Sequence, residues 1–173
     1  MTKPRPRTRC NNQPDTDTLF EQANRQWEAG RLKSAFRLFL AGAEAGDSSS
    51  QINLGNFYSD GIGVKPDRAR ALQWYRRAYH RGERAAASNI GILYRTENKL
   101  AQALAWFEKA VQLKDGDANV EIAKIYLDRN EPTLAVHYLK RARRAKPCDI
   151  TGDSREEAER LLQQMSASAK RRR

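Results

Sequence analysis

The sequence has little of what most catalytic and metal sites are built from. Only two cysteines and two histidines occur among its 173 residues. His80 and His137 lack the cysteine, serine or carboxylate arrangement that metal binding or catalysis requires. Cys10 and Cys148 have no partner pattern and no metal-ligand spacing, so we interpret both as free thiols. We therefore expect a protein that is not an enzyme, with no catalytic residue, metal site or cofactor.

Long hydrophobic runs are missing as well. No apolar segment approaches the roughly 20 residues that a membrane-spanning helix needs, so we expect no integral membrane association. The first ten residues, MTKPRPRTRC, carry charge without the apolar segment of a signal peptide. These two absences predict a cytoplasmic protein.

Basic residues outnumber acidic ones, but the excess lies at the two ends. The formal net charge of +11 comes from 32 basic and 21 acidic residues. Residues 1–14 and 166–173 hold four basic side chains each and no acidic one, which leaves 24 basic against 21 acidic residues between them. Because neither end has apolar side chains to bury, we predict disordered basic tails over residues 1–15 and 166–173, with a repeat domain over 16–165.

The part between the ends contains a helical pattern. In LGNFYSDGIGVKPDRARALQWYRRA, residues 54–78, small and aromatic side chains recur at spacings of three, four and seven, which is typical of one face of a helix. Glycines at positions 61 and 63 interrupt the first helix, and Asp67 after Pro66 is a suitable N-cap for the second. The segment therefore predicts two antiparallel helices joined by a turn.

The same pattern occurs four times along the chain. From the small residue of the first helix to the alanine of the second is 12 residues in three copies, and 16 in the copy that contains Gly61 to Val64. One four-residue insertion thus explains the one long copy. Units of this kind stack to bury their apolar faces, and about three are needed for stability. We predict an all-α superhelix, a solenoid of about four helix-turn-helix repeats, whose second-helix alanines are Ala35, Ala71, Ala103 and Ala135.

Two capping boxes mark the ends of this array. Thr18 and Glu21 have the spacing of a capping box, so we expect the first helix to begin at Thr18. Ser154 and Glu157 form a second one before a last helix that is apolar on one face and charged on the other. This last helix is predicted to cap the fourth copy, which gives nine helices in all.

The repeated unit resembles the tetratricopeptide repeat family. The insertion from Gly61 to Val64 and the pair Trp74-Tyr75 are similar, more narrowly, to its Sel-one-like branch, and the resemblance covers about residues 18–147. It implies a protein–protein interaction adaptor or scaffold that binds a peptide or protein partner in the concave groove of the array. The family's small, aromatic and alanine positions correspond here to Gly55, Tyr58, Ala71, Tyr75 and Ala78.

In that family, partner peptides commonly lie along the first helices. Asparagine side chains there can hydrogen-bond a peptide backbone, and basic side chains can hold a carboxylate. Packing between adjacent copies explains apolar neighbours such as Ile52, Val120 and Leu127 about as well as partner binding does. Our candidates for partner binding are Asn24, Asn56, Arg95 and Lys124.

Basic residues leave an alternative function open. The two tails could bind nucleic acid unspecifically, since they hold charge but no interleaved aromatic side chains that would stack on bases. A basic column on the second helices, made of Arg77, Lys109 and Arg141, either faces an anionic partner or is a solvated surface.

If all eight tail charges contact phosphates, the logarithm of the affinity for duplex DNA should fall with the logarithm of salt concentration at a slope of about −7. Fluorescence anisotropy of a labelled duplex, titrated at several salt concentrations, measures this slope. A flat salt response, or equal binding by a fragment of residues 15–165, would contradict the nucleic-acid hypothesis.

Overall fold

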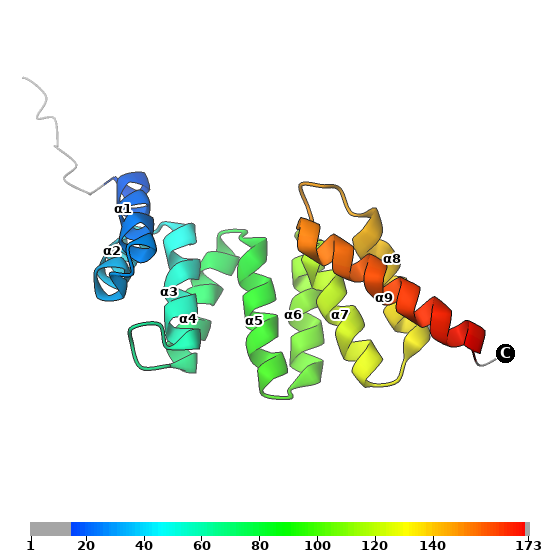
Figure 1. Ribbon diagram of the computed structural model, residues 1–173. Helices are drawn as coiled ribbons and strands as arrows, with labels where there is room; N and C mark the ends of the chain where they lie inside the picture. The colour runs from blue at the N-terminus through cyan, green and yellow to red at the C-terminus, as the bar shows by residue number, and fades with distance from the viewer. Residues whose placement is uncertain (1–14, 172–173) are drawn as a thin grey trace, which may run out of the picture.

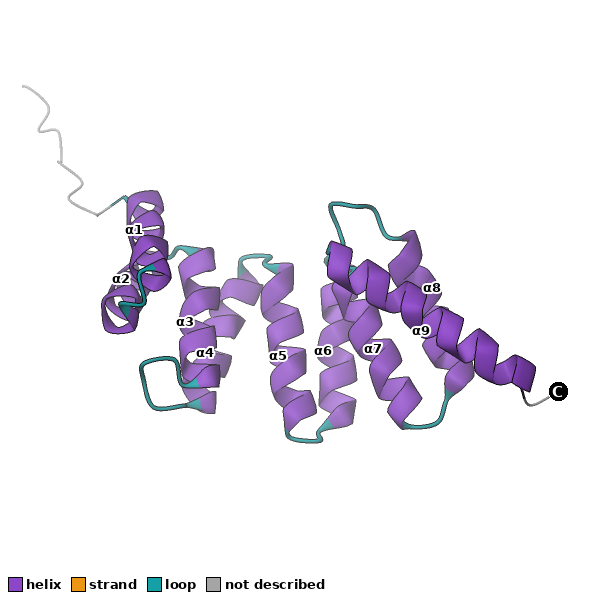
Figure 2. Ribbon diagram, in the orientation of Figure 1, coloured by secondary structure: helices purple, strands orange, loops and turns teal. Residues whose placement is uncertain are grey.

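A computed structural model describes residues 15–171 and the side chains as far as residue 167. This part of the chain forms nine helices and no strand, as predicted (Figure 2). Residues 1–14 and 172–173, which belong to the predicted tails, lie outside the described residues. The helices are α1 (Thr16–Glu28), α2 (Leu32–Ala45), α3 (Ser48–Asp60), α4 (Arg68–His80), α5 (Arg84–Thr96), α6 (Leu100–Gln112), α7 (Asp117–Asp128), α8 (Pro132–Arg144) and α9 (Gly152–Arg171).

The helices form four pairs that follow one another in a row (Figure 1). The pairs are α1 with α2, α3 with α4, α5 with α6, and α7 with α8, and each second helix packs against the first helix of the next pair. α9 packs on α8 and α7. This arrangement confirms the predicted superhelix of four repeats with a capping helix. No helix within residues 15–171 is both long and apolar enough to span a bilayer.

Within a pair, the two helices approach closely at the small residue of the first helix. A Cβ atom added to Gly91 would lie 2.6 Å from the ring of Phe107, and one added to Gly55 would overlap the ring of Tyr75. Phe107 is fully buried and Tyr75 nearly so. The ring of the second helix therefore occupies the volume that a side chain on the first helix would need.

Two helices begin earlier than their capping boxes predict. α1 begins at Thr16, because the Asp15 carboxylate accepts hydrogen bonds from the Asp17 backbone and the Thr18 hydroxyl. α9 begins at Gly152, and Thr151 Oγ1 accepts from the Ser154 backbone N–H at 3.3 Å. In both cases a side-chain oxygen upstream of the predicted cap accepts a hydrogen bond from a backbone N–H of the first turn. α9 also continues to Arg171, so residues 166–171 are helical and not part of the disordered tail that the sequence predicts.

The four-residue insertion forms a loop over residues 61–67 that touches the first repeat. Gly61 and Gly63 adopt positive φ angles of 70° and 66°, which glycine tolerates without strain. The Asp67 backbone N–H donates to the Tyr58 carbonyl at 2.8 Å and holds the end of the loop against α3. Val64 packs against clusters from both the first and the second repeat. The loop therefore links two repeats.

The segment between α8 and α9 folds back onto the join between the third and fourth repeats. Arg84, at the start of α5, donates to the Cys148 carbonyl at 2.7 Å and forms an ion pair with Asp149 at 3.2 Å. The Gly116 N–H donates to the Asp149 carbonyl at 2.6 Å, and Thr151 donates to the Asp117 carboxylate. Residues about 65 positions apart in the sequence are thus held together.

Replacing Gly91 with alanine should destabilise the array by about 1–3 kcal/mol, because the added methyl group overpacks against Phe107. Urea unfolding followed by circular dichroism measures the change. Gly152→Ala is the matched control, since a Cβ there meets nothing within 4 Å. Equal stability of the two variants would contradict the close approach described above.

Candidate partner-binding surface

The four candidate residues lie on the four first helices, one in each repeat. Asn24 is on α1, Asn56 on α3, Arg95 on α5 and Lys124 on α7, and all four side chains are half-buried. The helices that carry them follow one another along the array (Figure 1). No hydrogen bond between described residues joins Asn24 or Asn56 to another of the candidates.

The Asn56 side chain is oriented by two donors from neighbouring helices. Its Oδ1 accepts from the Tyr75 hydroxyl at 2.7 Å and from Asn89 Nδ2 at 3.3 Å. Burial, reinforced by the nearby charge of Asp60, raises the pKa of Tyr75 well above that of an ordinary tyrosine, so the hydroxyl stays protonated and donates. The Asn56 oxygen is therefore occupied, while its NH₂ group has no hydrogen-bond acceptor within residues 15–167.

Arg95 and Lys124 are connected through acidic side chains of the same chain. Glu121 forms ion pairs with Arg95 and, at 3.0 Å, with Lys124. Lys124 also pairs with Glu157 of α9 at 2.9 Å. Burial lowers the pKa of Lys124, but its hydrogen bonds to Glu157 and Glu121 outweigh this and raise the pKa above the usual value. Both cations are thus largely neutralised before any partner arrives.

Two large apolar side chains are exposed on the first helices. Trp27 on α1 and Ile92 on α5 each retain 38% of their accessible surface. Trp27 contacts Phe57 edge to face, with 5.0 Å between ring centroids, and Phe57 directly follows Asn56 on α3. Ile92 lies three residues after Asn89, the amide partner of Asn56. Apolar surface is therefore available on the helices on either side of the Asn56 amide.

The basic column on the second helices packs against aromatic rings. The Arg77 guanidinium lies 4.4 Å from the ring centroid of Trp74, and Lys109 Nζ lies 3.9 Å from that of Trp106. Arg141 lies over the ring of Tyr138 at 5.6 Å. Each of these cations makes a cation–π contact with an aromatic ring of its own helix. Such contacts favour a structural role for the column over an anion-binding one.

Sequence reasoning missed Asn89, Glu121 and Glu157. Glu121 precedes Lys124 by three residues, and this helical spacing could have indicated their ion pair. Asn89 lies 33 positions from Asn56, so no local pattern joins them. Glu157 reaches Lys124 only because α9 packs on α7.

Comparison with known proteins agrees with this geometry. Residues 48–83 and 124–146 match the Sel1 repeat, and residues 86–117 match the tetratricopeptide repeat. The sequence has no significant match among curated proteins.

Solved structures share the fold. A Sel1 repeat protein from Oxalobacter formigenes is 24% identical with a TM-score of 0.63; the match covers 74% of this chain and 57% of that one. The protective antigen c5321 of uropathogenic Escherichia coli, which has an SLR fold, is 23% identical with a TM-score of 0.64 over 74% of this chain and 30% of that one. The match therefore spans about half the length of the Oxalobacter protein and about a third of the length of c5321.

The stacked helix pairs define a helical repeat scaffold, a class that typically mediates protein–protein interaction. Within this class the chain is a Sel1-like repeat protein of the tetratricopeptide repeat superfamily.

The Tyr75 hydroxyl gives a testable pH effect. The pKa of Tyr75 is higher in the folded state than in the unfolded state, where it has the usual tyrosine value of about 10. The protonated hydroxyl therefore contributes fully to stability below about pH 10, and this contribution is lost as the pH rises further. The Tyr75→Phe variant should be about 1 kcal/mol less stable at neutral pH because a hydrogen bond is removed. It should also lose less stability than the unmodified protein between neutral pH and strongly alkaline pH.

Urea unfolding across this pH range checks both points. Tyr79→Phe serves as the control, because no hydrogen bond of the Tyr79 hydroxyl is found within residues 15–167. Identical pH profiles for the unmodified protein and Tyr75→Phe would show that burial of this hydroxyl has no energetic consequence.

Proposed function

We propose that this protein is a cytoplasmic adaptor that binds an extended segment of a partner protein in a concave groove along α1, α3 and α5. The observation that carries the proposal is the fixed orientation of the Asn56 amide. Tyr75 and Asn89 occupy its oxygen, so its NH₂ group is the part left for a ligand. A peptide carbonyl is a matching acceptor, and Asn89 Oδ1 could accept from the adjacent peptide N–H.

Exposed apolar side chains supply a second part of the binding surface. Trp27 of α1 contacts Phe57 of α3, and Ile92 lies on α5, which packs on α3. Side chains of an extended peptide on either side of the Asn56 contact could pack on these two exposed residues. Aromatic side chains such as tryptophan commonly anchor interfaces. The expected ligand is therefore a segment with apolar side chains on both sides of one exposed backbone amide.

The charged candidates support a different role. Arg95 and Lys124 are paired with Glu121 and Glu157, so a carboxylate ligand would have to displace an existing partner. The displaced glutamate would then lie close to the carboxylate of the ligand, and the two negative charges would repel each other. We infer that these two cations connect α5, α7 and α9, and that partner binding is centred on Asn56. Sel1 and tetratricopeptide repeats are generally non-enzymatic scaffolds, which fits an adaptor.

Affinity capture from the source cell, with the full chain as bait and nuclease treatment, should identify a partner protein. Asn56→Asp should then weaken its binding by about tenfold, because the substitution keeps the oxygen that Tyr75 contacts but removes the NH₂ donors. Isothermal titration calorimetry with the captured protein measures the change.

Asn98→Asp is a matched control, since it makes the same chemical change at an exposed turn. Lys124→Ala tests the other end of the array and should alter affinity by less than about threefold. If Asn56→Asp binds as tightly as the unmodified protein, the binding surface lies elsewhere on the array.

A further inference from the structure

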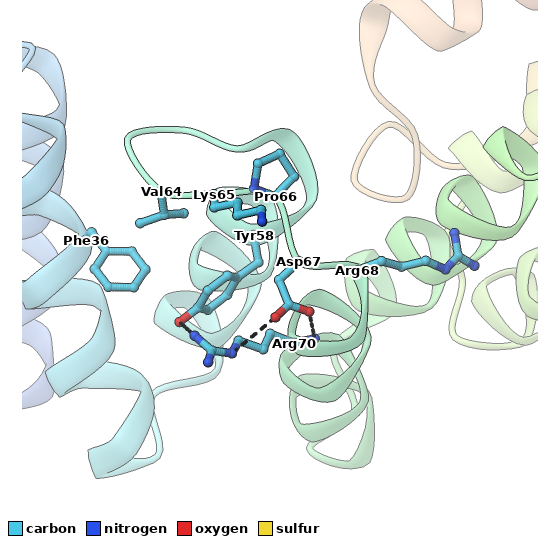
Figure 3. Close-up of a pocket in the computed structure, with 8 residues that line it drawn as sticks. All are labelled: Phe36, Tyr58, Val64, Lys65, Pro66, Asp67, Arg68 and Arg70. Carbon is cyan, nitrogen blue, oxygen red and sulfur yellow. Dashed lines mark hydrogen bonds and ion pairs between the residues drawn. The ribbon is translucent and has the colours of Figure 1, made fainter.

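A cavity of about 720 Å³ lies between α2, the end of α3 and the 61–67 loop (Figure 3). Four of its eight lining residues are aromatic or aliphatic: Phe36 comes from α2, Tyr58 from α3, and Val64 and Pro66 from the loop. Phe36 contacts Tyr58 edge to face, with 5.6 Å between ring centroids. The cavity therefore offers aromatic and aliphatic surface contributed by two different repeats.

Two of the three cations that line this cavity, Lys65 and Arg70, are exposed. The Arg70 guanidinium lies 5.4 Å from the Tyr58 ring centroid, donates to its hydroxyl and pairs with Asp67 at 3.3 Å. Lys65 is exposed, and no ion pair or hydrogen bond of its side chain is found within residues 15–167. Together with Asp67 these side chains carry a net charge of +1. The exposed guanidinium of Arg70 and the ammonium of Lys65 both keep donors for a ligand.

The remaining cation that borders the cavity is already used elsewhere. Figure 3 shows Arg68 directed away from Phe36 and Tyr58, toward α5. There it donates to the Leu93 carbonyl at 2.6 Å and pairs with Glu97 at 2.6 Å. Arg68 therefore joins the second and third repeats and leaves recognition at the cavity to Lys65 and Arg70.

Folding alone does not require this loop. In the third and fourth repeats, residues 97–99 and 129–131 suffice to join the two helices, whereas the second repeat uses residues 61–67. Packing against the first repeat accounts for Ile62 and Val64. It does not account for Lys65, whose ammonium lies beside the aromatic wall without an ion pair or hydrogen bond to any residue of 15–167.

We propose that this cavity binds a carboxylate attached to an apolar group. Lys65 and Arg70 hold the carboxylate, and Phe36, Tyr58 and Val64 contact the apolar part. A monoanion matches the local charge of +1, whereas a phosphate dianion would leave one negative charge uncompensated. This chemistry fits the C-terminus of a peptide that ends in an apolar residue, or a free aryl-alkyl carboxylic acid.

The cavity is distinct from the surface around Asn56. Tyr58 follows Asn56 by two residues, which places the two side chains on nearly opposite sides of α3. Ligands could therefore occupy both sites at once, and the cavity does not depend on the function proposed above.

Isotope-edited NMR of the full chain tests the proposal with three probes. The first is the peptide N-acetyl-Gly-Ser-Gly-Phe with a free carboxylate, the second is the same peptide with a C-terminal amide, and the third is phenylpropionate. The free-acid peptide should shift resonances of residues 61–67 and of the Arg70 side chain, with a dissociation constant on the order of 1 mM. The amide should bind at least about tenfold more weakly, because the charge-assisted hydrogen bonds are lost.

The strength of phenylpropionate binding identifies the source of the ligand. Affinity equal to that of the free-acid peptide supports a small-acid ligand, and tenfold weaker binding supports a peptide C-terminus. Lys65→Gln and Arg70→Gln should each weaken binding severalfold and together by about tenfold or more. Arg76→Gln, at an exposed position of the same helix, should leave it unchanged, as should Asn56→Asp.

Three results would overturn the proposal. The first is equal binding of the acid and amide peptides. The second is retained binding in the Lys65→Gln, Arg70→Gln double variant with an unchanged circular dichroism spectrum. The third is the lack of any saturable shift of residues 61–67 at about 10 mM of every probe, a concentration that would fill a millimolar site.

Discussion

The contact between a glycine on the first helix and an aromatic ring on the second sets the geometry of the second and third repeats. At Gly55 and Gly91 the rings of Tyr75 and Phe107 occupy the space of a side chain. This brings the two helices close enough for each pair to form a flat layer with apolar surface on both sides. Because such a layer cannot bury both surfaces by itself, it must stack on its neighbours. The superhelix is thus a consequence of where side chains are small.

The fold could be predicted because its information is local and repeated. Spacings of three, four and seven residues recur in four copies, so the helices of an ambiguous copy can be assigned from the other three. The ends of the array lack this redundancy. Thr18 and Ser154 fit capping boxes, yet Asp15 and Thr151 supply the oxygens that begin α1 and α9. The spacing of a capping box does not show which of two neighbouring side-chain oxygens accepts from the free backbone N–H groups.

The candidate surface could be predicted only in outline. Repeat position placed Asn24, Asn56, Arg95 and Lys124 on first helices, which the structure agrees with. What each side chain can do depends on residues far away in the sequence. Asn56 is oriented by Tyr75 and Asn89 from other helices, and Lys124 is neutralised by Glu157 of α9. The chemistry of the surface is therefore a property of the assembled stack, whereas its location is a property of the repeat.

The attachment of residues 148–151 to the start of α5 also affects how the array opens. In an ordinary stack each repeat contacts only its neighbours, so the ends fray one layer at a time. Here Arg84 holds the segment that follows the fourth repeat, and Gly116 and Asp117 hold it again at the join. The fourth repeat therefore cannot unfold separately from the third without breaking these contacts. Amide hydrogen exchange in α5 to α9 should consequently follow a single cooperative opening.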